Sequence, residues 1–443
     1  MLDHRDWYAA GLEHIWLPYA QMKTAPSPLP VVRTQGTRIH LADGRELVDG
    51  IASWWTACHG YNHPQIREVV QRQLEVMPHV MFGGMVHEQP LTLARRLAGM
   101  LPGDLSRVFF TDSGSVSVEV AMKMAIQYWL NRGQSGRTRF VCFRGGYHGD
   151  TLGTMAISDF ETGIHQKFAS LLHAHVAAAL PEDEATEAAL VSLLEQNAAS
   201  LAGIVVEPLV QGAGGMRFHD PEVLRRLRRL ADRFDLLLIF DEIFTGFGRT
   251  GAMFACESAG VTPDIITLSK ALTGGTLPLA ATLTTDAVFA AFWSDDRARA
   301  FFHGHTYTGN PLACAAGLAS LEVFRQEQTL ENVRAQATYL GERLSRDLAP
   351  LEWVGDIRQR GLMVGIELVR DRVKRMPFES VLRVGHRVCD AVRSLGVILR
   401  PLGNTLVWMP PLSLRREEAD LLVDVTVAAI RQVVPGLATG SRG

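Results

Sequence analysis

Two ionisable residues that could carry out amine chemistry follow short apolar runs that predict buried strands. Asp241 comes directly after the run Leu236–Phe240, and Lys270 follows Ile265–Leu268 with one residue between them. Because burial lowers the pKa of a lysine, a lysine at the end of a buried strand is a usable amine nucleophile. A carboxylate in such a place must be paired, protonated or bound to a cationic ligand. Taken singly, a surface lysine and a structural ion pair also explain these two residues.

Two further strand ends carry residues that could hold an anion and a flat ring. After Arg107–Phe110 the chain continues with Thr-Asp-Ser-Gly-Ser, in which Gly114 and Ser115 open a predicted helix. Small residues at a helix N-terminus expose backbone N–H groups and partial positive charge, which suits a phosphate, although helix capping alone would also explain them. After Arg139–Phe143 a glycine-rich turn presents Tyr147, and a bland loop is the alternative there.

Together these four strand ends suit one cofactor, pyridoxal phosphate. A lysine can form a Schiff base with its aldehyde, an acid can keep its pyridine nitrogen protonated, and a helix N-terminus can hold its phosphate. In open parallel sheets, functional groups collect beyond the carboxyl ends of the strands. The sequence therefore predicts a pyridoxal-phosphate site at that edge of the sheet.

Two motifs point to other chemistries. The run Gly246–Gly251 matches G-x-G-x-x-G, but it does not follow its strand directly and no clear helix opens behind it, which disfavours a dinucleotide site. His303 and His305, with His148 or Asp241, could indicate a metal hydrolase. Their spacing is not that of a helical zinc motif and no cysteine lies near them. We therefore expect no metal.

The elements that must position these residues alternate between apolar runs and helical patterns. Such an alternation predicts a parallel sheet buried on both faces, so we expect an α/β domain over residues 62–325. The predicted strands are Arg107–Phe110, Arg139–Phe143, Gly203–Val206, Leu236–Phe240 and Ile265–Leu268, and the predicted helices include Ser115–Tyr128, Glu182–Ala202 and Pro221–Phe234.

The two ends of the chain predict a second, smaller α+β domain. Residues 1–61 contain a predicted hairpin with the strands Val31–Thr34, Thr37–Leu41 and Glu46–Asp49. Residues 326–443 contain amphipathic helices and the predicted strands Gly361–Val369, Gly396–Leu399 and Thr405–Met409. We expect the N-terminal hairpin to join the C-terminal part in space.

The composition excludes several function classes. The 44 basic and 47 acidic residues give a formal charge of −3, which provides no field for nucleic acid or an anionic membrane. The five cysteines are scattered without a C-x-x-C pair, so we expect reduced thiols rather than a disulfide framework. No signal-peptide pattern and no apolar run of membrane-spanning length is present, so a cytoplasmic protein with small-molecule substrates is expected.

Three runs resemble the class III aminotransferases. They are Leu238–Gly251, which contains the acid, Pro263–Gly275, which contains the lysine, and His303–Pro311. Members of that family are fold-type I enzymes that use pyridoxal phosphate. The resemblance, which covers nearly the whole chain, implies a large α/β domain with a mostly parallel sheet of the seven-stranded type and a small α+β domain made from both chain ends.

Further stretches resemble one branch of that family, which converts 8-amino-7-oxononanoate to 7,8-diaminononanoate in biotin biosynthesis, with S-adenosylmethionine as amino donor. The stretches are His14–Tyr19, Ser53–Pro64, Asp112–Ala125, Gly146–Thr151 and Val206–Met216. The tyrosine of the first stretch and the tryptophan pair of the second discriminate the branch, because other class III branches share the lysine and the acid.

The resemblance implies a role for each matching residue around the cofactor. Lys270 would form the Schiff base and shuttle a proton, and Asp241 would pair with the pyridinium nitrogen. The pair Gly114–Ser115 would hold the phosphate, and Tyr147 would stack on the ring. Thr306 would reach the phosphate of the neighbouring subunit's cofactor, so a homodimer with shared active sites is implied.

The same resemblance implies a substrate pocket and an arginine at its end. The residues implied to line the pocket are Tyr19, which is also implied to be catalytic, Trp54, Trp55, Tyr147, Lys270 and Gly304. Arg400 would bind the distal carboxylate of the keto acid. An aromatic slot that ends in an arginine complements a long apolar acid, and aromatic faces attract a sulfonium. Without the resemblance, the tryptophans fit one core and one rim position, and the arginine fits a surface ion pair.

One position departs from the branch. Seven residues after Arg400, where members of the branch carry a tyrosine, this chain has Val407 with Trp408 beside it. The amino donor therefore stays open between S-adenosylmethionine and lysine. A class III aminotransferase of ω-amino acids or polyamines is the main alternative function. A non-catalytic binding protein of this fold is disfavoured by the presence of Lys270.

Overall fold

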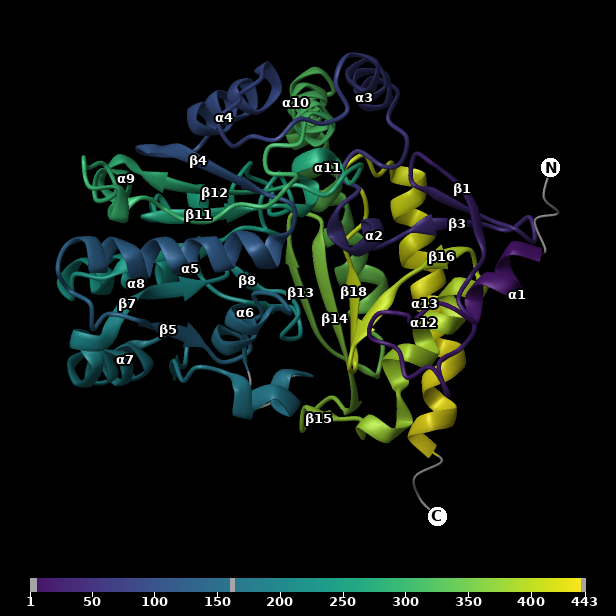
Figure 1. Cartoon of the computed structure of the whole chain (residues 1–443). Coiled ribbons are helices and arrows are strands. Elements are labelled where there is room, and N and C mark those ends of the chain that lie inside the picture. The colour runs from purple at the N-terminus through teal and green to yellow at the C-terminus, as the bar shows by residue number, and fades with distance from the viewer. Residues whose placement is uncertain (1–5, 160–163, 440–443) are drawn as a thin grey trace.

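The computed structural model describes residues 6–159 and 164–439, and its centre is a seven-stranded sheet (Figure 1). The strand order is β4–β12–β11–β10–β7–β5–β6. Parallel ladders join β11, β10, β7, β5 and β6, whereas β12 runs antiparallel to both β11 and β4. The strands are β4 (Leu105–Thr111), β5 (Arg139–Phe143), β6 (Val176–Ala178), β7 (Leu201–Val206), β10 (Leu237–Asp241), β11 (Ile265–Leu268) and β12 (Ala280–Thr285). The predicted α/β fold with a mostly parallel sheet is confirmed.

Helices cover both faces of this sheet, which explains why its central strands β7 and β10 are almost entirely apolar. On one face, Leu237 and Ile239 of β10 belong to an apolar cluster with side chains of α5 (Gly114–Asn131). On the other face, Leu238 and Phe240 share a cluster with side chains of α8 (Pro221–Arg233). Since successive side chains of a strand point to opposite faces, every residue of β10 is buried.

The predicted strands of this region are confirmed, and so are the predicted helices apart from the length of one. The sequence does not predict β6 or β12, and β12 is composed of alanine, threonine and one leucine, so it lacks the bulky β-branched and aromatic content of its neighbours. The predicted helix Glu182–Ala202 is too long. The helix α7 covers Glu184–Asn197, and Leu201 and Ala202 already belong to β7, because their backbone pairs in the sheet.

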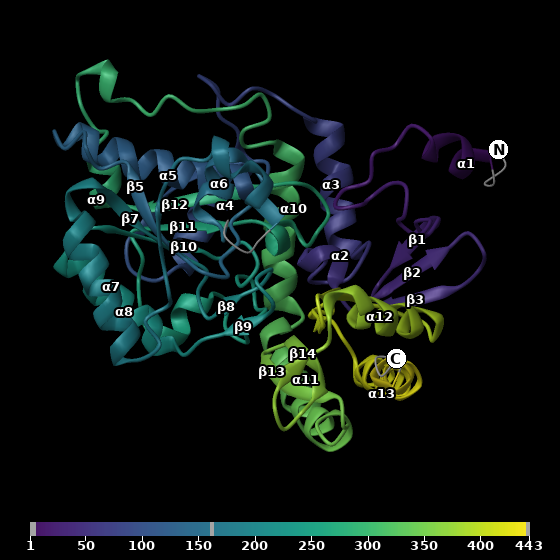
Figure 2. The same cartoon turned by 90° about the horizontal axis from the view of Figure 1, so that it is seen from below.

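The two ends of the chain meet beside this core (Figure 2). Strand β3 pairs in parallel with β16, and Leu47, Val48 and Val397 are buried there. The four-stranded sheet holds β1 (Val31–Gln35), β2 (Arg38–Leu41), β3 (Glu46–Asp49) and β16 (Val397–Ile398). The five-stranded sheet holds β13 (Val354–Arg360), β14 (Met363–Asp371), β15 (Met376–Pro377), β17 (Arg400–Leu402) and β18 (Thr405–Trp408). The division into domains at residues 61/62 and 325/326 stays a prediction.

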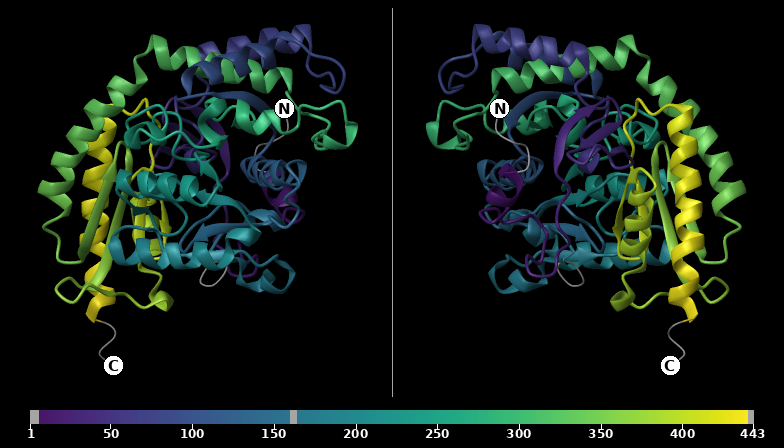
Figure 3. Two further views of the ribbon diagram at one scale, coloured as in Figure 1. Left: turned by 90° about the vertical axis from the view of Figure 1, so that its left-hand side faces the viewer. Right: turned by 90° about the vertical axis from the view of Figure 1, so that its right-hand side faces the viewer.

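A helical arm leads from the large sheet to the C-terminal sheet (Figure 3). It consists of α10 (Pro311–Gln326), which packs on α3 (Pro64–Val76) and α4 (Glu88–Met100), and of α11 (Thr329–Arg343). The remaining helices and strands are α1 (Asp6–Leu12), α2 (Ala52–Trp55), α6 (Leu152–Ile157), α9 (Asp286–Ala290), α12 (Val384–Ser394), α13 (Arg416–Thr439), β8 (Val210–Gln211) and β9 (Arg217–Phe218).

The C-terminal helix α13 is long and apolar enough to cross a membrane when length and composition alone are considered. It packs against α12 and α11, and its buried side chains include Leu422, Val423 and Ile430. Because the core helix of a globular protein passes the same test, this helix is weak evidence for a membrane span.

Candidate active site

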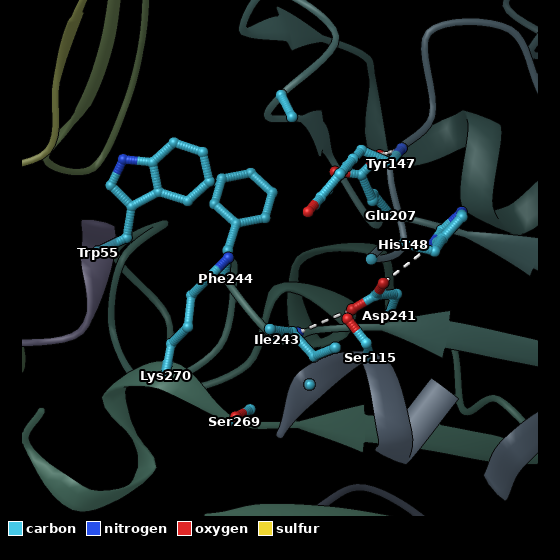
Figure 4. Close-up of a pocket in the computed structure, with 13 residues that line it drawn as sticks. Trp55, Ser115, Tyr147, His148, Glu207, Asp241, Ile243, Phe244, Ser269 and Lys270 are labelled. Atoms are coloured by element: carbon cyan, nitrogen blue, oxygen red, sulfur yellow. Dashed lines mark hydrogen bonds and ion pairs between the residues drawn. The ribbon is translucent and has the colours of Figure 1, made fainter. Parts of the chain in front are cut away.

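Several residues from the ends of different strands meet in one pocket at the carboxyl edge of the large sheet (Figure 4). Strand β10 ends in one wall of the pocket, the turn after β11 forms another, and the N-terminus of α5 opens into it. Residues that line the pocket include Trp55, Gly114, Ser115, Tyr147, Asp241 and Lys270. The rule that parallel strands present functional groups at their carboxyl ends therefore holds for this chain.

Asp241 is a buried carboxylate at the end of β10 with a histidine as its partner. Its Oδ2 lies 2.7 Å from Nδ1 of His148, and its Oδ1 accepts the backbone N–H of Ile243 at 3.1 Å. Burial alone would lower the pKa of His148, but the hydrogen bond and the negative charge of Asp241 raise it above its usual value. The pair is therefore held in place in the wall of the pocket.

Lys270 lies across the pocket from Asp241 (Figure 4). Its Nζ is 4.6 Å from the centroid of the Trp55 ring and 5.5 Å from that of Phe244. Burial lowers the pKa of Lys270 to about 8, although the charges of Asp241 and Glu207 act in the opposite direction. The backbone φ of Lys270 is 44°, a strained value for a residue with a side chain. The lysine is thus a weaker base than an exposed lysine, and about a tenth of it is unprotonated at pH 7.

The N-terminus of α5 reaches the pocket through Gly114 and Ser115. Ser113 caps this helix by accepting the backbone N–H of Val116. A Cβ on Gly114 would lie 2.9 Å from Cδ1 of Ile243, so a larger residue would have to displace that side chain. The N–H groups and the positive end of the helix dipole suit an anionic group such as a phosphate.

Glu207 is a second buried carboxylate, and it fixes the loop that carries Tyr147. Its oxygens accept the backbone N–H of Tyr147 at 2.9 Å and that of Gly212 at 3.0 Å. Burial raises the pKa of Glu207 to about 7, against the charge of His148. The Tyr147 ring stacks on His165 with centroids 5.9 Å apart, and its hydroxyl points into the pocket (Figure 4).

A second cluster, formed by Tyr19, Trp54 and Arg400, lies beside the pocket. Cζ of Arg400 is 4.6 Å from the Trp54 ring centroid, and the Tyr19 ring meets that of Trp54 edge-on at 5.5 Å. The Tyr19 hydroxyl donates to Asp150 and lies 3.3 Å from the hydroxyl of Tyr147, which connects the cluster to the pocket. Within residues 6–159 and 164–439, no carboxylate forms an ion pair with Arg400.

The two tryptophans project from α2, whose backbone is left-handed. The φ angles of Ala52, Ser53, Trp54 and Trp55 are 46°, 46°, 57° and 75°. The left-handed conformation costs an L-residue roughly 1–2 kcal/mol, so the turn is strained along its whole length. It sends the Trp55 ring to Lys270 and the Trp54 ring to Arg400.

The sequence profile of the family described as Aminotransferase class-III matches residues 19–430. The chain belongs to the class III aminotransferases. Among curated relatives of this aminotransferase, the adenosylmethionine-8-amino-7-oxononanoate aminotransferase of Geobacter sulfurreducens is 43% identical, over 98% of this chain and 98% of the relative.

Solved structures of class III enzymes match this aminotransferase along its length. The crystal structure of adenosylmethionine-8-amino-7-oxononanoate aminotransferase from Methanocaldococcus jannaschii has a TM-score of 0.94 at 36% identity, and the match covers 97% of this chain and 100% of that one. A PLP-bound amine transaminase from an uncultivated Pseudomonas species has a TM-score of 0.88 at 34% identity, covering 95% and 98%. The predicted family and the predicted fold-type I architecture are confirmed.

The structure places the predicted site residues of this aminotransferase in three locations. One group lines the pocket: Gly114, Ser115, Tyr147, Asp241, Lys270 and Trp55. Tyr19, Trp54 and Arg400 form the second cluster beside it. Gly304 and Thr306 are exposed in the loop before α10 and do not line the pocket of their own chain. The roles of all these residues stay predictions.

The pocket lining also includes residues that are absent from the predicted site, among them His148, Glu207 and Phe244. Glu207 directly follows β7, so the rule that found Asp241 could also have found it, but its surroundings in sequence predict an exposed turn. The sequence gives no signal for the pairing of His148 with Asp241, because the two residues are far apart in the chain and are brought together by the sheet.

The glycine-rich run Gly246–Gly251 and the histidines His303 and His305, which could indicate other chemistries, make different contacts in this aminotransferase. No helix opens directly behind Gly246–Gly251, and Arg249 within it is buried and donates to the carbonyls of Met409 and Pro410. Nδ1 of His303 lies 3.0 Å from Nζ of Lys123. The described part of the chain holds no group of three or more His, Cys, Asp and Glu side chains arranged to bind a metal ion.

Proposed function

We propose that this class III aminotransferase transfers an amino group to 8-amino-7-oxononanoate, with pyridoxal phosphate as cofactor and S-adenosylmethionine as amino donor, and so makes 7,8-diaminononanoate for biotin biosynthesis. The observation that carries the proposal is the position of Arg400, which stacks on Trp54 beside the Lys270 pocket without an ion-pair partner among the described residues. The relatives from Geobacter sulfurreducens and Methanocaldococcus jannaschii, both named adenosylmethionine-8-amino-7-oxononanoate aminotransferase, support it.

The pocket residues fit pyridoxal phosphate. Lys270 provides the amine for its aldehyde, Asp241 with His148 behind it provides a negative charge for its ring nitrogen, and Gly114 and Ser115 provide helix N–H groups for its phosphate. Bound there, the cofactor would supply an aldehyde that accepts amines and a ring that withdraws electrons.

The side chains of the pocket would then bind, orient and move protons. Nζ of Lys270 would remove a proton from the substrate carbon that bears the amine and deliver it again on the way to product. Asp241 would keep the ring nitrogen positive, in a site where burial makes an ion pair stronger than it is in water. Trp55 and Phe244 exclude water from the side of the lysine, because their rings cover its amine.

The second cluster would bind the acceptor. A long apolar chain would lie along Trp54 and Tyr19, and its terminal carboxylate would pair with the guanidinium of Arg400. The aromatic rings would bury the methylene groups of the acceptor. The arginine would select acceptors by chain length, since a shorter acid cannot reach it. The hydroxyls of Tyr19 and Tyr147 lie where the cluster meets the pocket and would orient the reacting end.

The donor is proposed on the aromatic content of the same cluster, because a sulfonium is attracted to aromatic faces. Val407 is the direct cross-strand partner of Arg400 on β18 and β17, so the departure from the branch lies next to the arginine that would bind the acceptor. Residues directly opposite on antiparallel strands share a face of the sheet. A comparison of S-adenosylmethionine with lysine as donor therefore belongs in the first experiment.

We further propose a homodimer in which Thr306 reaches the partner subunit's cofactor. In one chain, Thr306 and Gly304 are exposed, in a loop that meets the segment 76–86 through His79 and Tyr307, whose ring centroids are 4.6 Å apart. The two segments expose several large apolar side chains: Val76, Met81, Val86, Trp293, Phe302 and Tyr307. Exposed large apolar side chains gathered on two neighbouring segments are typical of a subunit interface.

A mixing experiment tests the shared site. Dimers reassembled from Lys270→Ala and Thr306→Arg subunits should regain activity, since each mixed dimer would contain one intact site with the lysine of one chain and the threonine of the other. Each variant alone should be inactive. No recovery on mixing, or a monomer by light scattering, contradicts the shared site.

The proposed compartment is the cytoplasm. All five cysteines are buried and none of them forms a disulfide bond with another described residue, which is in keeping with a reducing environment. Cell fractionation with an antibody to the protein tests this proposal.

The first experiment is the visible absorption spectrum of the purified protein with pyridoxal phosphate, before and after each candidate donor. A yellow band that bleaches with S-adenosylmethionine, followed by recovery of the band with 8-amino-7-oxononanoate, is the expected result. Bleaching by lysine alone would keep the acceptor and replace the donor. Bleaching by simple ω-amines, with no response to the keto acid, would favour the ω-amino acid or polyamine alternative.

A further inference from the structure

The left-handed turn Ala52–Trp55 is a strained segment whose conformation decides where two aromatic rings of the site point. The alanine, serine and two tryptophans that form it have no intrinsic preference for positive φ. A right-handed or extended backbone here would move both rings away from their present neighbours, Lys270 and Arg400. Something outside the turn must therefore stabilise it.

A buried carboxylate, Asp49, makes the contacts that the turn needs. Its Oδ1 accepts the backbone N–H of Ile51 at 2.9 Å, and its Oδ2 accepts the backbone N–H of Ser53 at 2.8 Å. The hydroxyl of Tyr61 donates to the same Oδ2 and also contacts Oγ of Ser53. Asp49 is fully buried, so these hydrogen bonds replace all of its contacts with water.

We propose that Asp49 and Tyr61 are positioning residues, which hold the left-handed turn so that Trp54 meets Arg400 and Trp55 covers Lys270. The part that concerns substrate rests on the proposed function, whereas the part that concerns the two rings does not. Neither residue lines the pocket, so their effect on the site passes through the turn.

The geometry of the contacts explains why this residue is an aspartate. The two N–H donors and the tyrosine hydroxyl need acceptors on both oxygens of one side chain. Asparagine has the same size and has one acceptor oxygen, so Asp49→Asn leaves at least one donor of the turn without a partner. Burial raises the pKa of Asp49, whereas the hydrogen bonds from Tyr61, Ile51 and Ser53 act in the opposite direction because they stabilise the charged carboxylate.

Near-ultraviolet circular dichroism of the apoprotein tests the placement of the rings. Asp49→Asn and Tyr61→Phe should each change the tryptophan bands, and the same substitutions should have no such effect in a Trp54→Phe/Trp55→Phe background. Adding Ala52→Gly to Asp49→Asn should restore much of the signal, because glycine adopts positive φ without strain. An unchanged spectrum, or a change that persists without the two tryptophans, would overturn the proposal.

The kinetic readout separates positioning from general stability. With the holoenzyme, Asp49→Asn should raise KM for the keto acid about tenfold and change kcat much less, because a misplaced binding wall acts on substrate placement. The matched control is Asp264→Asn, which removes a carboxylate bonded to the N–H of Leu238 and to Arg228 before β11, at the opposite edge of the sheet. The control should lower the melting temperature and leave KM unchanged.

These two readouts keep the proposals distinct. If the wild-type protein does not aminate the keto acid, the proposed function fails and the circular dichroism still decides the positioning proposal. If the wild-type protein is active and Asp49→Asn lowers the melting temperature as Asp264→Asn does, without a rise in KM and without rescue by Ala52→Gly, the positioning proposal is wrong.

Discussion

The pocket around Lys270 and the cluster around Arg400 lie side by side, but they differ in how deeply their side chains are buried and in whether their charged groups have partners within the chain. In the pocket, Asp241 is 4% exposed and has a histidine partner and a backbone partner. In the cluster, Tyr19 is 58% exposed and Trp54 39%, and the arginine has an aromatic face rather than a carboxylate beside it. The pocket is thus preorganised by its own chain, whereas the cluster leaves its arginine without an ion-pair partner among the described residues, as the proposed carboxylate ligand requires.

Both regions contain strain, and it is balanced in different ways. Lys270, with a φ of 44°, lies between the buried strands β11 and β12, in a segment where the hydroxyl of Thr273 donates to the carbonyl of Leu277. The left-handed turn Ala52–Trp55 lies between β3 and α3, and its conformation depends on the hydrogen bonds that Asp49 accepts. Substitutions in the first region should therefore act on chemistry, and substitutions in the second on binding.

The largest effect is expected at the amine of the pocket. In the proposed mechanism Lys270 both attaches the cofactor and moves the proton, so Lys270→Ala should lower transamination by on the order of 10⁴-fold or more. The variant should still bind pyridoxal phosphate through the remaining contacts, without the covalent bond. Amino transfer and the visible spectrum measure the two effects, and Lys374→Ala at an exposed position is the control. Normal turnover in Lys270→Ala would rule out the mechanism.

The next effect is expected at the acid of the pocket. Breaking a buried ion pair by removing one charge costs about 3–5 kcal/mol, which corresponds to a factor between roughly 10² and 5 × 10³ in rate. Asp241→Asn should therefore reduce kcat by about that factor and leave KM for the keto acid nearly unchanged. Asp264→Asn, with its carboxylate at the other edge of the sheet, should leave kcat unchanged. A loss confined to KM would place Asp241 in the binding region and break the comparison.

The two regions also differ in how well the sequence predicts them. Asp241 and Lys270 follow uninterrupted apolar strands, so a local pattern and the strand-end rule are enough to bring them together. The resemblance to the branch adds Tyr19, Trp54, Trp55 and Arg400, but it does not give their orientation.

The orientation depends on contacts between residues that are far apart in the chain. The left-handed turn is set by Asp49 and Tyr61, and nothing in the residue types of Ala52–Trp55 indicates it. The same reason hides the pairing of His148 with Asp241, and it hides β12, whose burial comes from the sheet rather than from its own composition. Whether Gly304 and Thr306 complete a site depends on a second chain.

A smaller effect is expected in the cluster. Arg400→Met removes charge-assisted hydrogen bonds to a carboxylate, which contribute about 1.5–3 kcal/mol, so KM for the keto acid should rise roughly 10–100-fold with a smaller change in kcat. Arg400→Lys keeps the charge without the planar guanidinium, so its KM for the keto acid should lie between those of the wild type and of Arg400→Met. Arg393→Met, which removes an arginine bonded to Asp390 on α12, is the control and should leave KM unchanged. A fall in kcat alone would show that the arginine acts on chemistry.

The smallest effect is a pH dependence that belongs to the pocket alone. Burial lowers the pKa of Lys270 from its usual value to about 8, so the unprotonated amine, which is the form that reacts with aldehydes, becomes dominant as the pH rises through 8. Between pH 7 and pH 9 the reactive fraction should rise about tenfold. Reductive trapping of a small aldehyde on the apoprotein, located by peptide mass spectrometry, measures this rate at Lys270. If the rate at Lys270 showed no midpoint near pH 8 and still rose steeply above pH 9, the rings of Trp55 and Phe244 would not desolvate the amine, and the pocket would be as open to water as the cluster beside it.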